Sequence, residues 1–318
     1  MIHSRISGTG SYLPERVVTN HELEKMVDTT DEWIRTRTGI ERRHIAAPGE
    51  TTVDLAEHAA RRALAAANVA PADVDFIAFG TTTPDLIFPN CGVLLQQRLD
   101  CRGGPAFSVE TACAGFMYAL SIADKYVRCG EARRALVVGS ETLSRITDWN
   151  DRATAVLFAD GAGAVLLEPA DAPGVLSTHL HADGHYKDLL CCASGVSRGF
   201  AAPLAITMAG NEVFKVAVTK LGAAVEETLA ANGLDRTALD WLVPHQANIR
   251  IIQATARRLE LPMERVIVTV QEHGNTSAAS VPLALDVAVR DGRIRRGDLL
   301  LLEAFGGGFT WGSALVRY

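Results

Sequence analysis

Residues 105–127, PAFSVETACAGFMYALSIADKYV, predict a short strand that turns into a helix, with one cysteine at the junction. Polar and apolar residues alternate over 106–110, and apolar residues recur at helical spacing from Phe116 to Val127. Cys113 then lies in the first helical turn, where free amide N–H groups and the helix dipole favour an anion by ~1 kcal/mol and at most ~2 kcal/mol. This effect predicts a thiol pKa lowered from ~8.5 towards ~7, so that the nucleophilic thiolate is well populated. A buried and inert cysteine is the competing interpretation.

Composition indicates an ordinary globular chain. It has 318 residues, of which 48% are hydrophobic and 21% charged, enough for two domains or one large duplicated domain. A formal net charge of −6 argues against nucleic-acid binding as the main role. The six cysteines form no CxxC pair and are too sparse for a disulfide scaffold, which suits the cytoplasm. Neither a signal peptide nor an apolar run of ~18 residues is present, so we expect no export and no membrane span.

Predicted strands and helices alternate along the chain, which favours an α/β fold. We expect a helix capped by Asn20, a helix that begins at Thr30, and an alanine-rich helix that opens at Thr52. The remaining expected elements are strands at 74–80 and 135–139, a helix at 90–99 and a long glycine-containing strand at 154–168.

The second half of the chain repeats the first. LAAANVAPADVDFIAFG, from Leu64, matches LAANGLDRTALDWLVPH, from Leu229, and the turn PADAPG separates a half at 1–171 from a half at 172–318. Two later segments also match, with Gly130 on Gly292, and counting back from them places Asn275 at the position of Cys113. The sequence therefore predicts a duplicated α/β fold. A dinucleotide-binding fold fits poorly, because the G-x-G motifs at 8–10 and 161–163 are not followed by a helix.

Three further elements could act with the thiol. His245 follows the apolar strand of DWLVPHQANIR, Asn275 opens a helix in QEHGNTSAASVPLALD, and three glycines, 306–308, join two strands. Each has a purely structural alternative: a loop hydrogen bond for the histidine, an N-cap for the asparagine and a plain turn for the glycines. Together they suit thioester chemistry, because glycine amides can approach a reacting carbonyl. A papain-like Cys-His-Asn hydrolase is the rival, although the repeat aims Asn275 at the reacting centre instead of behind His245.

At these motifs a family resemblance emerges. TACAGF, VPHQANIRII, EHGNTSAASVPLALD and AFGGGFTWG resemble the motifs of the β-ketoacyl-acyl carrier protein synthase III family, and the likeness runs from end to end. It implies a thiolase fold whose two duplicated halves form a layered αβαβα architecture. It also implies that Cys113 takes an acyl group from acyl-coenzyme A and condenses it with malonyl-acyl carrier protein, with loss of carbon dioxide.

The resemblance also assigns residues. Catalysis falls to Cys113, His245 and Asn275, with the amides of Cys113 and Gly307 as oxyanion donors. Coenzyme A contacts are implied at Thr29, Trp33, Arg37, Arg152, Asn211, Phe214, Ala247 and Asn248. Carrier-protein contacts are implied at Lys215, Gln246, Arg250 and Arg257; the last two share one face of a helix whose opposite face is apolar. The acyl pocket is implied at Phe88, Leu143, Phe158 and Leu189, with Phe88 reaching it from the neighbouring subunit of a homodimer.

Some features stay outside this scheme. The spacing of His179, His181 and His185 resembles a metal site, but alternation on a strand explains the first two, and we expect neither a metal nor a permanent cofactor. Residues 186–203, which include Cys191 and Cys192, resemble the family least and are interpreted as a flap. Two alternatives remain: a relative that makes a specialised metabolite, and a non-catalytic module that binds acyl carrier protein.

Overall fold

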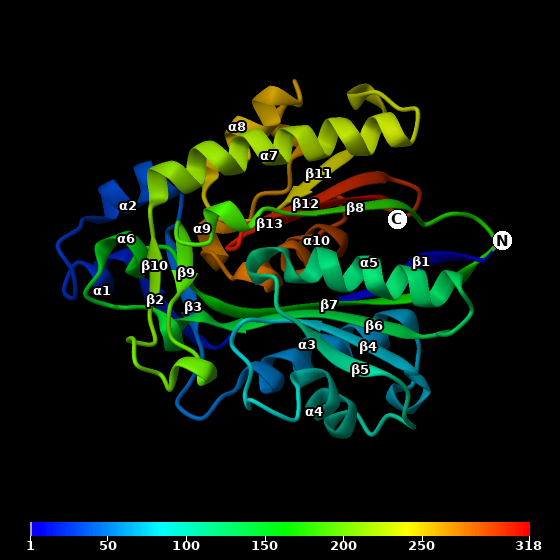
Figure 1. The fold of residues 1–318 in the computed structure, drawn as a ribbon. Coiled ribbons are helices and arrows are strands. Elements are labelled where there is room, and N and C mark those ends of the chain that lie inside the picture. Colours follow the sequence, from blue (N-terminus) through cyan, green and yellow to red (C-terminus); the bar gives the residue numbers. More distant parts are fainter. Residues whose placement is uncertain (1) are drawn as a thin grey trace.

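The structure, a computed structural model that describes residues 2–318, stacks two sheets between three layers of helices (Figure 1). The long apolar stretches of the sequence form the sheets, which are therefore buried on both faces, as is typical of sheets with helices on either side. The predicted layered α/β architecture is confirmed. No helix within residues 2–318 has the length and apolar character needed to cross a membrane.

The first sheet is built only from strands of the first half. Its order is β1-β7-β6-β4-β5. β4 runs parallel to β5 and β6, whereas β7 is antiparallel to both β6 and β1. The strands are β1 (His3–Tyr12), β4 (Phe76–Gly80), β5 (Ala106–Val109), β6 (Ala135–Thr142) and β7 (Asp160–Ala170).

The second sheet follows the same plan in the second half, with the order β11-β12-β13-β8. Here β11 is parallel to β12, and β13 is antiparallel to both β12 and β8. Val266 makes an isolated parallel bridge to Leu242, where β5 stands in the first sheet. The strands are β8 (Val175–Ala182), β11 (Trp241–Pro244), β12 (Leu299–Gly306) and β13 (Thr310–Arg317). We propose that 1–171 and 172–318 are the two duplicated units.

Two helices, α5 and α10, lie between the sheets and contact both. α3 and α4 cover the outer face of the first sheet, and α7 packs on the outer face of the second, with α8 beside it (Figure 1). Burial of the apolar faces of these helices supplies most of the folding free energy, at about 25 cal/mol per Å². The helices are α1 (Asn20–Leu23), α2 (Asp31–Thr38), α3 (Thr52–Ala67), α4 (Cys91–Arg98), α5 (Gly115–Arg128), α6 (Arg152–Ala155), α7 (Gly210–Ala231), α8 (Ile249–Arg258), α9 (Val270–His273) and α10 (Ser280–Arg290).

The pairing of Asn275 with Cys113 by counting is wrong by three residues. α5 has 14 residues and α10 has 11, and each follows a one-turn 3₁₀ helix, at 112–114 and 277–279. Ala112 and Ser277 open these turns with φ values of +46° and +50°. Ser277 is therefore the counterpart of Ala112, and Ala278 that of Cys113. The count failed because α10 is three residues shorter than α5. The difference lies inside the helix, where no turn or glycine marks it in the sequence.

Two local predictions also need correction. Thr19, not Asn20, caps α1, and its hydroxyl accepts the Glu22 N–H in a capping box. The strand expected from residue 154 begins only at Asp160, because Asp151 caps the short helix α6 there. Two short ribbons complete the fold: β2 (Arg16–Thr19) with β3 (Arg42–Ile45), and β9 (Leu190–Cys192) with β10 (Ile206–Met208). The predicted flap thus contains one strand of a hairpin.

Candidate active site

Cys113 lies in the 3₁₀ turn that joins β5 to α5, as the strand-to-helix pattern predicted. The side chain is 7% exposed. The end of β12 approaches this turn so closely that a Cβ on Gly306 would lie 2.5 Å from the Cys113 amide nitrogen. Only glycine permits this approach, which brings the backbone of 306–307 beside the thiol.

His245 stands directly after β11, at the carboxyl end of the second sheet. Its N–H donates to the Glu303 carbonyl at 2.8 Å, which extends the pairing of β11 with β12 by one residue. The ring Nδ1 contacts the Ser280 hydroxyl of α10. Burial lowers the pKa of His245 to about 3, so the imidazole is neutral at pH 7.

Asn275 is fixed by its own backbone and by its side-chain oxygen. Its N–H donates to the Leu157 carbonyl and its C=O accepts the Ala159 N–H, both at 2.9 Å. The side-chain Oδ1 accepts the Ser277 N–H at 2.9 Å. Because Oδ1 is occupied, the Nδ2 amide group is the part of the side chain left to donate.

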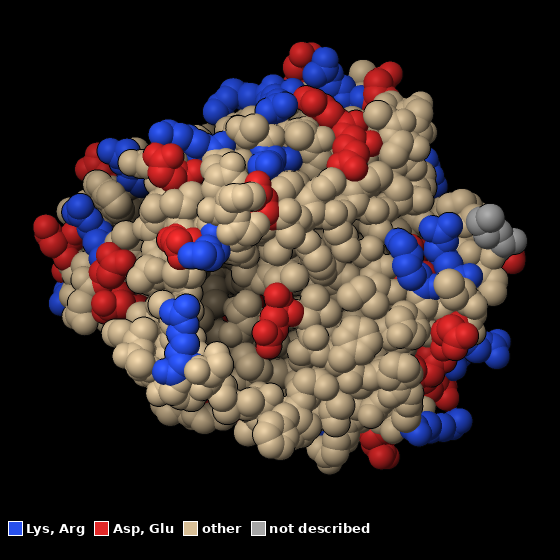
Figure 2. All heavy atoms as spheres, in the orientation of Figure 1, with Lys and Arg blue, Asp and Glu red and all other residues tan. Residues whose placement is uncertain are grey.

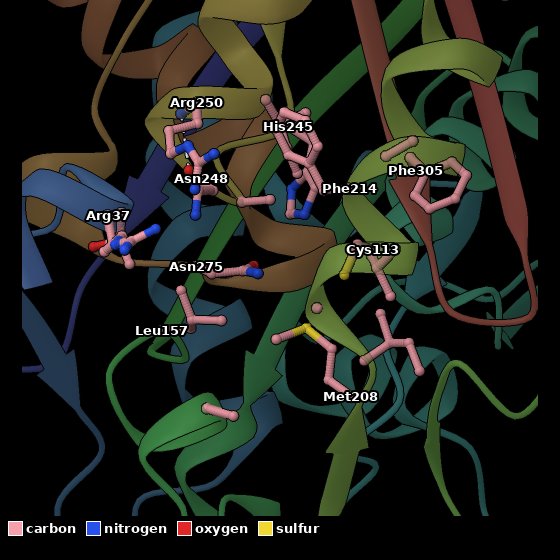
Figure 3. Close-up of a pocket in the computed structure, with 18 of the residues that line it drawn as sticks. Arg37, Cys113, Leu157, Met208, Phe214, His245, Asn248, Arg250, Asn275 and Phe305 are labelled. Carbon is pink, nitrogen blue, oxygen red and sulfur yellow. Dashed lines mark hydrogen bonds between the residues drawn. The ribbon is translucent and has the colours of Figure 1, made fainter. Parts of the chain in front are cut away.

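These three side chains line one cavity of about 380 Å³. Figure 3 shows the sulfur, the imidazole and the carboxamide converging on it from different elements, with Phe214 and Met208 at its sides. The surface is hollowed beside β9, towards the start of α5, with charged side chains on the rim (Figure 2). The segments that carry His245 and Asn275 lie far from Cys113 in the sequence, and the fold brings them to the same cavity as the predicted nucleophile.

The predicted thiol pKa near 7 is wrong for the resting protein. Burial raises the pKa of Cys113 to about 12, and the nearby Glu141 carboxylate adds to the increase. Removing a thiolate from water costs more than the ~1–2 kcal/mol that a helix N-terminus returns. Cys113 therefore rests as a thiol.

A second cavity, of about 310 Å³, opens on the other side of Cys113. Leu143 and Phe158 line it, as the resemblance implied, together with Gly307. The assignment of Leu189 is wrong: Leu190 lines both cavities and Leu189 lines neither, although both pack against the cluster around Phe309. Leu189 lies in the bend that follows a turn, and β9 begins at Leu190, so the strand carries Leu190 and not Leu189 to the cavities.

Most of the residues implied for coenzyme A surround the mouth of the first cavity. The Arg152 guanidinium lies over the Trp33 ring, 4.9 Å from its centroid. Thr29 and Arg152 do not line the cavity, but the buried Thr29 hydroxyl has no hydrogen-bond partner in the described residues. Those that do line it are Trp33, Arg37, Asn211, Phe214, Ala247 and Asn248.

The residues implied for the carrier protein divide into exposed and buried. Arg250 and Arg257 are exposed on α8, and Lys215 is exposed on α7, where it pairs with Glu212 at 2.8 Å. Gln246 is wrong as a contact, because it is 1% exposed. Its side chain donates to the carbonyls of 244 and 267 and accepts the N–H groups of 269 and 270, so it braces the loop that holds His245.

The geometry disfavours the papain-like alternative. In such hydrolases an asparagine orients the histidine, yet here the Nδ1 of His245 contacts Ser280 and the oxygen of Asn275 binds the Ser277 N–H. His179 and His181 both contact Glu227, as expected for alternate residues of β8. Within residues 2–318 no three side chains of the metal-binding types are grouped closely enough for a metal ion.

Sequence reasoning missed the roles of Ser277, Ser280 and Glu141. The two serines lie within the motif that carries Asn275, so their hydroxyls were visible as candidate partners. Glu141 lies more than a hundred residues earlier in the chain, and no local pattern marks it as a neighbour of the site. Only the packing of β6 against the turn at 277–279 brings it there.

Comparison with known proteins connects this geometry to a family. A model of 3-oxoacyl-[acyl-carrier-protein] synthase III matches residues 107–184, and the model of its C-terminal region matches 229–318. The β-ketoacyl-[acyl-carrier-protein] synthase III of Thioalkalivibrio sulfidiphilus is 63% identical over 322 residues that cover 100% of both chains. The Xanthomonas campestris pv. campestris protein of the same name is 64% identical and covers 100% of this chain and 99% of its own.

Solved structures agree with the sequence comparison. The crystal structure of 3-oxoacyl-[acyl-carrier-protein] synthase III from Aquifex aeolicus superposes with a TM-score of 0.95 at 46% identity, covering 99% of this chain and 100% of its own. A priming β-ketosynthase from a polyketide biosynthetic pathway reaches 0.94 at 40% identity, covering 99% and 96%. With its duplicated layered fold and its thiol, imidazole and carboxamide in one cavity, the chain belongs to the β-ketoacyl-[acyl-carrier-protein] synthase III family of acyl-transferring condensing enzymes.

Proposed function

We propose that the enzyme joins an acyl-coenzyme A primer, such as acetyl-coenzyme A, to malonyl-acyl carrier protein and so begins fatty-acid chains. The meeting of Cys113, His245 and Asn275 in one cavity carries this proposal. Cys113 accepts the acyl group and coenzyme A leaves as a thiol. The malonyl carboxylate then leaves as carbon dioxide, and the resulting enolate attacks the acyl-enzyme. The test is to supply both substrates and assay 3-oxoacyl-carrier protein; free acid without consumption of malonyl-carrier protein would indicate a hydrolase.

His245 and Asn275 are assigned to the enolate oxygen as hydrogen-bond donors. A Ser280 hydroxyl that donates to Nδ1 leaves the ring proton on Nε2, and the neutral ring keeps that proton through the physiological range. Asn275 offers Nδ2 because its oxygen is occupied. Each donor aimed at a developing oxyanion contributes about 3–4 kcal/mol in a site that excludes water. Decarboxylation then requires no general base.

The acyl oxyanion is assigned to the amides of Cys113 and Gly307. The close approach of Gly306 to the Cys113 amide supports this role, and Cys113 and Gly307 line the same cavity. Leu143 and Phe158, across the second cavity, supply the apolar wall for the acyl chain. Comparing acetyl, isobutyryl and longer acyl-coenzyme A esters would identify the primer, and a strong preference for an unusual ester would favour a specialised pathway like that of the priming ketosynthase.

Coenzyme A is assigned to the first cavity and its rim. Trp33 and Arg152 already stack on each other, so an adenine ring would enter between them once the exposed Arg152 side chain turns aside. Arg37 and Thr29 are assigned to the phosphate groups. The pantetheine arm is assigned to the tunnel walls, which are Asn211, Phe214, Ala247 and Asn248.

The carrier protein is assigned to the basic face of α8, with Lys215 beside it. Arg257 has no ion-pair partner among residues 2–318, whereas the adjacent Arg258 pairs with Glu226 at 3.4 Å. An acidic carrier would be drawn to unpaired cations near the cavity mouth, mainly through faster association.

Arg257→Gln is therefore expected to raise the KM for malonyl-carrier protein by about 3–10-fold at low salt, with less effect at high salt. Acylation by acyl-coenzyme A should change little, because Arg257 does not line the cavity. Arg258→Gln is the matched control on the same helix. Steady-state kinetics at two salt concentrations measure this, and equal effects of the two substitutions would contradict the docking assignment.

The protein is assigned as a homodimer whose interface includes the segment around Phe88. Leu86, Ile87 and Phe88 are 49%, 68% and 84% exposed, an apolar run that a stable monomer would not leave in water.

The cytoplasm is assigned as the cellular location. The six cysteines are unpaired, which supports a reducing compartment.

Phe88→Asp is expected to convert a dimer into monomers in analytical ultracentrifugation, because a carboxylate would be buried without a partner at the contact. The fold should survive, since the side chain contributes little to the core. Met26→Asp, at a position that is 50% exposed and outside this segment, is the control. A wild-type monomer, or a Phe88→Asp dimer, would remove the assignment.

A further inference from the structure

Glu141, near the end of β6, is a fully buried acid whose oxygens have no cationic partner among residues 2–318. Its Oε2 accepts hydrogen bonds from Thr81, Thr82 and Thr83, and its Oε1 accepts one from the Thr82 hydroxyl at 3.1 Å. These donors stabilise the carboxylate, whereas burial raises its pKa. Burial is the largest of these effects, so the pKa of Glu141 lies above the ordinary value of a glutamate.

Ser277 connects this acid to the reactive thiol. Its hydroxyl donates to Oε1 of Glu141 at 3.1 Å, and Ser277 and Cys113 line the same cavity. Burial raises the pKa of the Cys113 thiol, and the Ser277 side chain acts in the opposite direction. The backbone holds Ser277 at φ +50°, a left-handed conformation that costs a non-glycine residue energy and is common at functional sites.

The direction of these bonds is set by the number of hydrogens available. A hydroxyl has one proton and two lone pairs, so when Ser277 donates to Glu141 its oxygen remains free to accept from the Cys113 thiol. In the thiolate form the same groups reverse, with a protonated Glu141 donating to Ser277 and Ser277 donating to sulfur.

We propose that Ser277 passes the Cys113 proton to Glu141 when the thiol is acylated and returns it when the thiolate is released. This inference rests on the proposed function, because it describes how the same thiol is charged and discharged. In this proposal Ser277 acts as a catalytic residue between the thiol and Glu141, and Glu141 acts through it as a proton store.

The proton balance closes over one turnover. In acylation the Cys113 S–H bond breaks, Ser277 takes that proton while giving its own to Glu141, and the sulfur electron pair forms the bond to the acyl carbon. The departing coenzyme A thiolate takes a proton from solvent. In condensation the enolate displaces sulfur, and the thiolate recovers its proton from Ser277 while Glu141 gives one back. One solvent proton is consumed for each carbon dioxide released.

Among the described residues that line the two cavities, no titratable side chain is a better acceptor for the thiol proton. With a pKa near 12, Cys113 has a thiolate fraction of only ~10⁻⁵ at pH 7. His245, with a pKa near 3, does not hold a proton at that pH. Cys91 is the other titratable group that interacts with Glu141, but it is buried in the core cluster beneath the first sheet and does not line the cavity.

The test compares Ser277→Ala and Ser277→Gly with Thr81→Val. Glycine suits the left-handed backbone, so this variant removes the hydroxyl without threatening the fold. Thr81→Val removes one hydrogen bond to Glu141, 3.0 Å long, without touching either cavity. The readouts are single-turnover acylation by acetyl-coenzyme A, followed by intact mass, and alkylation of Cys113 by iodoacetamide, both measured from pH 6 to about pH 10.

Both Ser277 variants are expected to slow acylation and alkylation by about 10²-fold at pH 7, with the loss shrinking as hydroxide takes over at high pH. Thr81→Val should stay within about threefold of the wild type. A wild-type rate in the Ser277 variants, or a loss that is equal at every pH, overturns the relay. Alkylation requires neither of the proposed substrates. A wild-type enzyme that is alkylated but never acylated would therefore contradict the proposed function, while the alkylation rates would still test the relay.

Discussion

Cys113→Ser is expected to abolish condensation, with a loss of at least ~10³-fold in turnover and no acyl-enzyme detectable by intact mass. The hydroxyl is a much weaker acid than the thiol, and the burial that raises the Cys113 pKa would penalise an alkoxide even more. The fold should be unaffected, because the replacement is nearly isosteric. Acylation by labelled acetyl-coenzyme A, followed by denaturation and mass spectrometry, measures the effect directly.

Cys129→Ser supplies the control for this experiment. Cys129 is an exposed thiol at the other end of α5. The substitution replaces sulfur by oxygen, as in Cys113→Ser, at a residue that lines neither cavity. It should leave turnover and acyl labelling unchanged. Full condensation activity in Cys113→Ser would remove the nucleophile assignment and revive the non-catalytic carrier-binding module.

Asn275→Ala is expected to separate the two half-reactions. The variant should still acquire label from acyl-coenzyme A, because the nucleophile and its oxyanion amides remain. Release of carbon dioxide from malonyl-carrier protein should fall by about 10²–10³-fold, the usual result of removing one oxyanion donor. Parallel measurements of bound label and of carbon dioxide released from carboxyl-labelled malonyl-carrier protein would show the split.

Asn275→Asp distinguishes a lost donor from a disturbed loop. An aspartate oxygen can still accept the Ser277 N–H, which preserves the local fold, but its other oxygen cannot donate to an enolate. We expect it to release carbon dioxide as slowly as the alanine variant. An Asn275→Ala enzyme that takes up no label, or one that decarboxylates at the wild-type rate, contradicts the assigned role.

The positions of Cys113 and His245 were predictable because each lies at the end of an element with strong local periodicity. The alternation before Cys113 and the helical spacing after it place the thiol at a strand-to-helix junction, and the apolar strand before His245 places that residue at a sheet edge. Local patterns were weaker inside elements. The strand expected from residue 154 and the repeat count to Asn275 both failed where a short helix or a helix-length difference left no sequence signal.

The sequence by itself determined most of the order of strands and helices, the duplication, and the positions of Cys113 and His245 at element ends, because these depend on neighbours within one turn or one strand. Tertiary structure decided the rest. Tertiary packing raises the pKa of Cys113 and buries the side chain of Gln246. It also brings Glu141 into a hydrogen bond with Ser277, which lines the same cavity as the thiol. Desolvation and long-range hydrogen bonds depend on what packs around a group from distant parts of the chain, and no stretch of sequence contains that information.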